Sequence, residues 1–409
     1  TMKRLSNIEP GLLVKAKFIG PGKVKTESIA GASFGFALLW TLVFAVLATI
    51  VLQEMAARLG LASRQGLGEA VRSTFSQPLI RLVTCGFILV AIAFGNAAYQ
   101  AGNLSGASIG LSTLFPASRI WVLIISGLTF VLLISGKYKL IERVLIALVV
   151  LMSLVFLLTA LMTRPPIGEM TRGMFQPTIP DGSLAMILGL IGTTVVPYNL
   201  FLHSSSVQEK WSTEVPVEEA LGESRRDTVL AITLGGLVTL AILTTAAATF
   251  YGKGGLKNAA DMARQLEDVL GGPAAQITFE LGLFSAGLTS SITAPLAAAY
   301  ATCGVMGWKP DLNSWRFRGV WILVLGLGTL AALMGGSPAD TILIAQVANG
   351  LLLPFIAIFL LIVVNRKILM GERKNGIISN LLGFIVVLIA TGLGTWKIYQ
   401  ELRLVPAIH

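Results

Sequence analysis

The chain has 409 residues, of which 54% are hydrophobic and only 13% are charged, and its formal net charge is +10. Soluble domains carry roughly 25% charged residues, so this composition excludes an ordinary soluble protein. It also argues against a nucleic-acid partner, because the basic residues are spread over the short loops between apolar segments.

A membrane-spanning helix needs about 20 predominantly apolar residues. Segments of this kind lie at about 11–33, 36–58, 79–102, 119–135, 140–163, 183–208, 228–250, 274–304, 317–335, 340–365 and 377–399. The alternating pattern of about 10 residues per strand that marks a membrane β-barrel is not found in the sequence. We therefore predict an all-α polytopic membrane protein with about eleven transmembrane helices and a single transmembrane domain over 1–409.

The distribution of Lys and Arg indicates the orientation of the chain. With the N-terminus placed inside, 19 of the 31 basic residues fall in inside segments and 8 in outside segments, and the first span holds the other four, Lys15, Lys17, Lys23 and Lys25. Cytoplasmic loops are enriched in Lys and Arg. We therefore expect the N-terminus inside and the C-terminus outside, in the lipid bilayer of a bacterial cytoplasmic (inner) membrane.

Two local patterns have structural interpretations. Glu54 and Arg58 lie four residues apart at the inner end of the second span and predict an ion pair within one helix. Residues 257–270 carry apolar side chains at helical spacing and predict a short amphipathic helix on the outer face. We interpret this helix as a solvated loop helix without a function of its own.

Two polar breaks, Gly20-Pro21-Gly22-Lys23 and Val196-Pro197-Tyr198-Asn199, interrupt the first and sixth spans. A broken helix survives in lipid only where protein buries it or where it lines a cavity. Paired breaks at corresponding places in two halves indicate the binding site of an inverted-repeat transporter. The sequence therefore predicts two five-span repeats, at about 11–163 and 183–365, with an extra span at about 377–399.

Four groups of motifs carry a family resemblance. Gly192-Thr-Thr-Val-Val-Pro-Tyr-Asn-Leu-Phe-Leu-His-Ser204 is similar to a sixth-helix G-A-T-V-M-P-H-N-L-Y-L-H-S, and Gly20-Pro-Gly-Lys23 aligns with D-P-G-N. Ala286 to Thr293 is similar to an eighth-helix A-G-Q-S-S-T-(I/L)-T. Ala345-Gln-Val347, followed by Leu353-Pro-Phe355, is similar to a tenth-helix pair, S-Q-V and L-P-F. In this order and spacing, over about 10–400, the sequence resembles the Nramp family of divalent-metal transporters.

The resemblance implies a LeuT-type fold, alternating access and a secondary membrane transporter of a divalent metal ion. The family's metal-binding positions fall here on Gly20, Lys23, Thr193, Val196 and Gln346. Along the family's proton path, Tyr198 replaces a His, and Gln100 and Asn103 replace two carboxylates, whereas His203 is retained. Tyr198 and the retained Asn199 are also expected at the substrate site. These replacements indicate that proton coupling of the family type is lost.

The residue types at these positions indicate a remodelled binding site. Val196 has no sulfur to favour a soft metal, and Gly20 offers only a backbone carbonyl. Two like unit charges 4 Å apart at an effective dielectric of 20 repel by about 4 kcal/mol, so Lys23 disfavours a cation. Any metal cargo is expected in the same cavity, bound by backbone carbonyls, Thr193, Asn199 and Gln346, and no cofactor is expected.

Two other functions remain open. The first is transport of a small anionic or zwitterionic solute with Lys23 as the counter-charge, since the N-terminal ends of two half-helices add partial positive charge. Lys25 and Glu27 either pair with each other or belong to the transport pathway. Lys15 and Lys17 are expected to extend toward the cytoplasmic membrane interface. The second is a membrane sensor or scaffold that does not transport. An enzyme is not expected, because the spans lack H-E-x-x-H and G-x-S-x-G motifs.

Overall fold

The structure is a computed structural model that describes residues 20–112, 118–135, 139–211, 213–253, 256, 259–309, 311–334 and 338–404. Every regular element in these ranges is helical, as predicted. The helices are α2 (Pro21–Phe34), α3 (Leu39–Ser63), α4 (Leu67–Thr74), α5 (Pro78–Ser112), α6 (Ser118–Ser135), α7 (Lys139–Met162), α8 (Ile167–Phe175), α9 (Leu184–Thr194), α10 (Pro197–Lys210), α11 (Val217–Phe250), α12 (Ala259–Ala263), η3 (Arg264–Leu266), α13 (Glu267–Leu270), α14 (Gly272–Met306), α15 (Trp315–Met334), α16 (Pro338–Val364), α17 (Lys367–Met370), η4 (Gly371–Arg373) and α18 (Ile377–Leu404).

The helices of this part of the chain coincide with the predicted spans. Nine of them, with α9 and α10 taken together, are long and apolar enough to cross a membrane. The shorter apolar helix α6 and the half-helix α2 occupy the two other predicted positions. The first half of span one, including Lys15 and Lys17, lies outside the described residues, so their predicted orientation stays a prediction.

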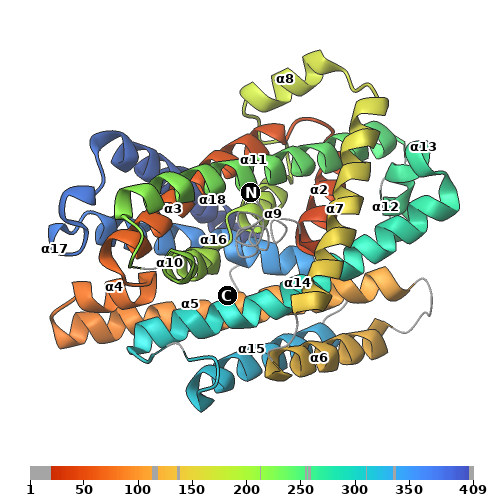
Figure 1. Cartoon of the computed structure of the whole chain (residues 1–409). Coiled ribbons are helices and arrows are strands. Elements are labelled where there is room, and N and C mark those ends of the chain that lie inside the picture. The colour runs from red at the N-terminus through yellow and green to blue at the C-terminus, as the bar shows by residue number, and fades with distance from the viewer. Residues whose placement is uncertain are drawn as a thin grey trace, which may run out of the picture.

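The long helices α5, α11, α14 and α15 run in roughly the same direction, whereas α7 crosses them (Figure 1). The helix α5 packs against α14, α15 and α16, and α2 packs against α11. Small residues allow these close contacts: a Cβ on Gly287 of α14 would lie 2.5 Å from the Cβ of Ala107 of α5. A Cβ on Gly31 of α2 would lie 2.3 Å from the carbonyl oxygen of Leu243 of α11. Close backbone approach at small residues is how membrane helices gain packing energy.

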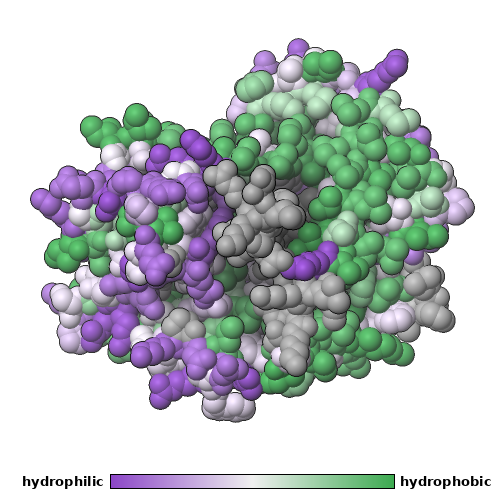
Figure 2. All heavy atoms as spheres, in the orientation of Figure 1, coloured by the Kyte–Doolittle hydropathy of each residue, from purple (hydrophilic) through white to green (hydrophobic). Residues whose placement is uncertain are grey.

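The two ends of this bundle differ in polarity (Figure 2). Hydrophilic side chains gather on the left, over the ends of α3, α10 and α17, whereas apolar side chains cover most of the right. Large apolar side chains such as Leu82, Phe94 and Leu161 are exposed on the helix sides. An exposed apolar belt on helices of this length is the surface that a lipid bilayer covers.

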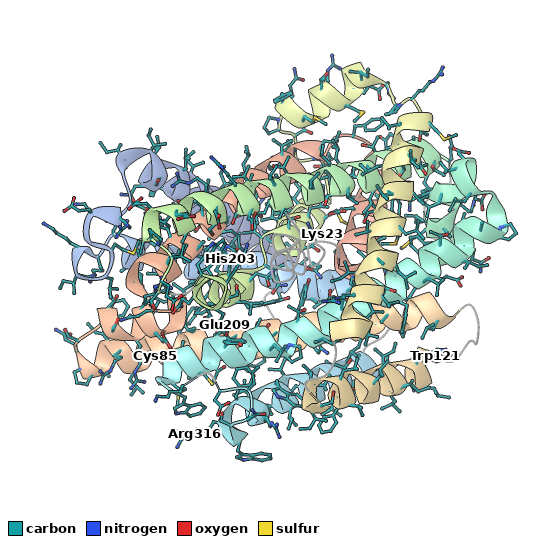
Figure 3. All side chains as sticks on the ribbon, in the orientation of Figure 1. Lys23, Cys85, Trp121, His203, Glu209 and Arg316 are labelled. Carbon is teal, nitrogen blue, oxygen red and sulfur yellow. The ribbon has the colours of Figure 1, made fainter. Side chains whose placement is uncertain are left out.

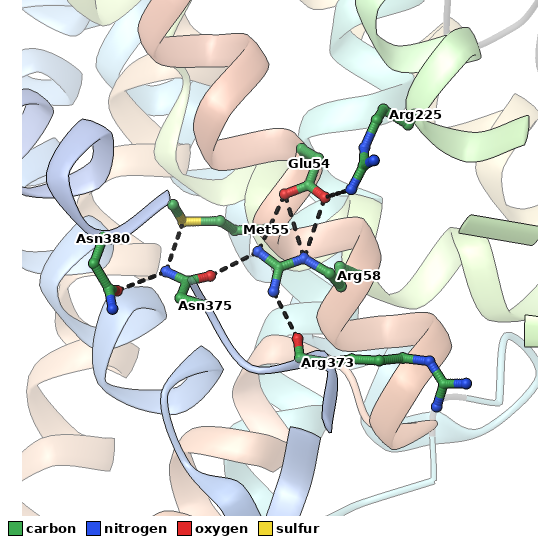
Figure 4. Close-up of polar contacts among 7 residues, drawn as sticks. All are labelled: Glu54, Met55, Arg58, Arg225, Arg373, Asn375 and Asn380. Carbon is green, nitrogen blue, oxygen red and sulfur yellow. Dashed lines mark hydrogen bonds and ion pairs between the residues drawn. The ribbon is translucent and has the colours of Figure 1, made fainter. Parts of the chain in front are cut away.

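A polar network fastens the charged end of α3 (Figure 4). Arg58 Nε lies 3.1 Å from Glu54 Oε1, which confirms the predicted pair, and Arg225 Nη2 lies 2.9 Å from the same oxygen. The Arg58 guanidinium also donates to the carbonyl oxygen of Arg373 at 2.7 Å and to Asn375 Oδ1 at 2.6 Å. The network therefore joins α3 to the start of α11 and to the loop between α16 and α18.

The segment between α11 and α14 corrects one prediction. It is helical in α12, η3 and α13, but its apolar side chains are not solvated. Met262, Ala263 and Leu266 are buried and pack with Val24 of α2 and Phe279 of α14. The helical spacing was identified correctly, but the partner of the apolar face is the protein itself, which local periodicity cannot reveal.

Candidate functional site

Both predicted breaks are present in the backbone. Gly20 is extended, with φ −97° and ψ 165°, and Pro21 begins α2. Val195 and Val196 separate α9 from α10, with φ −97° and ψ 76° and then φ −77° and ψ 115°. Proline suits the first helical position, because its fixed φ is helical and its missing N–H would have no partner there. Each break therefore starts a new helix, and its N-terminal end carries partial positive charge.

The two breaks open onto one cavity of about 220 Å³, here called the break cavity. Its wall runs from Gly20 and Lys23 at the first break, past the second break, and along α10 and α11 to Lys210 and Asp227. Figure 3 shows Lys23 and His203 near the middle of the helix bundle, on α2 and α10. The cavity is large enough for a small ion with several water molecules.

Most residues predicted to bind substrate line this cavity. The lining includes Gly20, Lys23, Thr193, Val196, Tyr198, Asn199 and His203. Five other predicted site or pathway residues are absent from it: Lys25, Glu27, Gln100, Asn103 and Gln346. The breaks thus bring the substrate-binding candidates together, whereas most pathway candidates lie behind the wall.

The charged residues of α2 interact in a different way from the predicted pairing. Lys23, which is 3% exposed, interacts electrostatically with Glu27, one helical turn further on. Lys25 interacts with Asp340 at the start of α16 rather than with Glu27. Glu27 is fully buried, and among the described residues neither carboxylate oxygen has a hydrogen-bond partner. Glu27 is therefore a buried carboxyl group without a hydrogen-bond partner in the described part of the chain, one helical turn from Lys23.

Gln346 of α16 lies between the two broken helices and is not among the residues that line the cavity. A Cβ on Gly22 of α2 would lie 2.2 Å from Gln346 Nε2, and a Cβ on Gly192 of α9 would lie 2.0 Å from the Gln346 carbonyl oxygen. Gln100 and Asn103 are also buried, and Gln100 Nε2 donates to the carbonyl oxygen of Ser291 at 3.2 Å. In this conformation Gln346 packs both half-helices against α16.

The cavity also contains residues that the sequence analysis did not select as site residues. A Cβ on Gly20 would lie 3.3 Å from Ser290 Oγ and 3.4 Å from the Tyr99 hydroxyl. Tyr99 stacks edge-on against Tyr198, with ring centroids 5.2 Å apart. Two hydroxyl groups therefore border the space of a side chain at position 20. Two features of the sequence could have identified these residues. Ser290 lies in the eighth-helix motif, and Tyr99 directly precedes Gln100.

Polar residues on α10 and α11 form the charged mouth of the cavity. His203 Nε2 lies 3.4 Å from Thr228 Oγ1. At the end of α10, Lys210 forms an ion pair with Asp227, and its ammonium lies 4.1 Å from the ring centroid of Trp211. Cations near a tryptophan face are attracted to the ring. These contacts tie α10 to α11 beside the mouth.

The groups that line the cavity would bind a divalent metal ion only weakly. Within the described ranges, no group of three or more His, Cys, Asp or Glu side chains could hold a metal ion. The Gly20 carbonyl already accepts the backbone N–H of Lys23 at 3.1 Å and of Val24 at 3.3 Å. Thr193 and Asn199 supply a hydroxyl and an amide, which suit a hard cation better than a soft one.

Two broken helices that meet at one central cavity, within a bundle of membrane-length helices, define a membrane transporter of the LeuT-type inverted-repeat class. The chain belongs to the Nramp family, because the family model described as "Natural resistance-associated macrophage protein-like" matches residues 11–400. Family membership makes it a secondary membrane transporter and not an enzyme, as predicted.

Relatives and solved structures agree with this assignment. The chain is 31% identical to a divalent metal cation transporter, MntH, of Nostoc sp., over 98% of this chain and 92% of that protein. It is 29% identical to MntH of Yersinia pestis, over 98% and 96%. The Eremococcus coleocola manganese transporter gives a TM-score of 0.77 at 23% identity, covering 97% of this chain and 87% of that one. MhsT in complex with L-phenylalanine gives 0.62 at 15% identity, covering 94% and 98%. The structural likenesses confirm the predicted LeuT-type fold.

Proposed function

We propose that the chain works by alternating access and that its cargo binds in the break cavity. The observation that carries this proposal is the single cavity shared by both helix breaks, which continues to the Lys210–Asp227 pair. In the proposed domain organisation, one transmembrane domain over 1–409 contains repeats at about 11–163 and 183–365 and an extra span at about 377–399. The two repeats would rock around the fixed cavity, as in other broken-helix transporters.

The first proposed cargo is a divalent metal ion. The relatives named as divalent metal cation transporters support it, and so do Thr193 and Asn199 as oxygen ligands. Because the cavity offers no thioether at Val196, weak discrimination between manganese and magnesium is expected. Since Gln100 and Asn103 cannot titrate, uptake is expected without proton coupling of the family type.

The second proposed cargo is a small anionic or zwitterionic solute. The observation that favours it is Lys23 on the cavity wall, beside the N-terminal ends of α2 and α10. Two hydroxyl groups, from Tyr99 and Ser290, add further hydrogen-bond donors around Gly20. An ammonium, two helix N-termini and hydroxyl donors together suit a carboxylate.

Uptake into liposomes by the purified full-length protein separates the two cargoes. Wild type, Lys23→Ala and Lys25→Ala are each measured with manganese, with magnesium and with a panel of small carboxylates. Lys25→Ala is the matched control, because it removes the same charge two residues away, from a side chain that does not line the cavity.

Metal uptake that is kept or increased in Lys23→Ala would support the metal cargo and eliminate the anion. Carboxylate uptake that is lost in Lys23→Ala and kept in Lys25→Ala would support the anion and eliminate the metal. An absence of flux for every compound, together with specific recovery of a partner protein, would refute transport and favour the sensor or scaffold.

We also propose the orientation from the basic residues. The loops that hold the Arg58 network and Lys210 would face the cytoplasm, so the N-terminus would lie inside and the C-terminus outside. The proposed location is a bacterial cytoplasmic (inner) membrane, with the bilayer and the transported ion or solute as partners. Cysteines at Lys374 and Lys253, probed with an impermeant maleimide on oriented vesicles, would test this: reaction of Lys374→Cys from the outer side would contradict it.

A further inference from the structure

The segment 259–270, here called the α12–α13 segment, closes the end of the molecule opposite the cavity mouth. It joins the far ends of α11 and α14, and Figure 1 places α12 and α13 on the side away from α10 and α17. Leu266 is fully buried and Met262 nearly so, and both belong to the apolar cluster that contains Val24 of α2. The segment therefore lies against the half-helix that begins at the first break.

Gln265 makes the polar contact at this closure. Its Nε2 donates to Ser28 Oγ of α2 at 2.9 Å and to the carbonyl oxygen of Met262 at 3.0 Å. Its Oε1 accepts from Thr245 Oγ1 of α11 at 3.2 Å. The single Thr245 proton also has carbonyl acceptors at 2.9 and 3.0 Å within α11, so the Ser28 contact is the stronger link between helices. Gln265 is 1% exposed, and its partners Ser28 and Thr245 are fully buried.

The position of Ser28 connects this contact to the cavity. Ser28 and Lys23 lie five residues apart on α2, which corresponds to about 7.5 Å along one rigid helix. Lys23 lines the break cavity, whereas the residues of α2 beyond it, like those of the α12–α13 segment, take no part in the lining. A tilt of α2 that opened a path from this end would therefore have to separate Ser28 from Gln265.

We propose that Gln265 is a positioning residue that holds α2 closed through Ser28 and so sets the balance between the two access states. This inference rests on the proposed alternating-access transport. Releasing the Gln265–Ser28 hydrogen bond favours the state in which the cavity opens toward the α12–α13 segment. The bond breaks and reforms in each transport cycle, while the apolar contacts of Met262 and Leu266 reseal the end.

Accessibility of α2 tests this role without any flux measurement. In full-length protein with Cys85→Ser and Cys303→Ser, a reporter Val24→Cys is labelled with an impermeant maleimide in nanodiscs. The reporter is combined with Gln265→Leu, with Ser28→Ala, and with Gln276→Leu as the matched control. Gln276 lies near the same end on α14, where its Nε2 donates to Glu280 Oε1 at 2.8 Å. The conservative variant Ser28→Thr keeps a hydroxyl oxygen that accepts from Gln265 Nε2, and it is expected to keep the reporter protected.

We expect Gln265→Leu and Ser28→Ala to increase the labelling rate by about tenfold, which corresponds to the loss of one buried hydrogen bond of about 1.4 kcal/mol. The double variant should be labelled no faster than either single variant, because both remove the same contact. Equal rates in Gln265→Leu, Gln276→Leu and the parent would overturn the inference. If no compound is transported and the rates still differ as expected, the hydrogen bond controls α2 even though the proposed transport fails.

Discussion

Gly192→Ala is expected to push the half-helix α9 away from α16 and to disturb the second break. A Cβ at this position would lie 2.0 Å from the Gln346 carbonyl oxygen and 2.5 Å from the Gly350 backbone nitrogen. An ordinary contact begins near 3.4 Å, so the two backbones would have to separate by about 1.4 Å. Because both obstructing atoms are backbone, no side-chain rotation relieves the clash. Overpacking of this kind lowers the free energy of unfolding by about 1–3 kcal/mol, and we expect a loss near the upper end of this range for Gly192→Ala.

The matched control is Gly189→Ala, one turn earlier on the same face of α9. Its Cβ would lie 3.2 Å from Leu343 Cδ1 and 3.4 Å from Thr26 Cγ2, which are movable side-chain atoms. Thermal unfolding in detergent, followed by tryptophan fluorescence, should give a clearly lower midpoint for Gly192→Ala and a nearly unchanged one for Gly189→Ala. Cargo uptake should fall only in the first variant, because Thr193 moves with Gly192. Equal midpoints for the two variants would refute the close approach of α9 to α16.

Three further variants test the charged end and the cavity wall. Arg58→Gln removes charge-assisted hydrogen bonds from the network in Figure 4 and should lower the free energy of unfolding by about 2–3 kcal/mol. The control is Lys374→Gln in the same loop, and similar thermal midpoints for the two variants would contradict this prediction. Tyr99→Phe removes one hydroxyl beside Gly20 and should raise the KM for the cargo; an unchanged KM would exclude Tyr99 from the binding site. Lys210→Ala leaves the Asp227 carboxylate at the mouth and should raise cation uptake relative to carboxylate uptake; an unchanged ratio would show that the mouth does not select by charge.

The breaks illustrate what a sequence can predict about a membrane protein. Pro21 and Pro197 each interrupt an apolar segment, and a proline at the first helical position starts a helix without help from its neighbours. The breaks could therefore be located from local chemistry. Their placement around one cavity followed from the repeat pattern, and with it the grouping of Lys23, Thr193 and Asn199.

Contacts between distant segments could not be predicted in the same way. Gln346 was expected at the binding site, which stays a prediction; the structure places it between Gly22 and Gly192, which leave room for α16 there. Lys25 was expected either to pair with Glu27 or to belong to the pathway, and the charged neighbour that the structure gives it is Asp340, more than 300 residues away. In both cases the sequence identified a polar residue inside a span, and only the packing of two helices decided which group it faces.

The sequence by itself determined the all-helical membrane class, the two helix breaks and the family, because each depends on apolar length, proline and motif order along the chain. The tertiary structure decided which side chains share the cavity, that the Tyr99 and Ser290 hydroxyl groups lie beside Gly20, and that Gln265 ties the α12–α13 segment to α2. These features depend on distances between helices that are far apart in the chain. Side-chain periodicity within a single helix gives no measure of such distances.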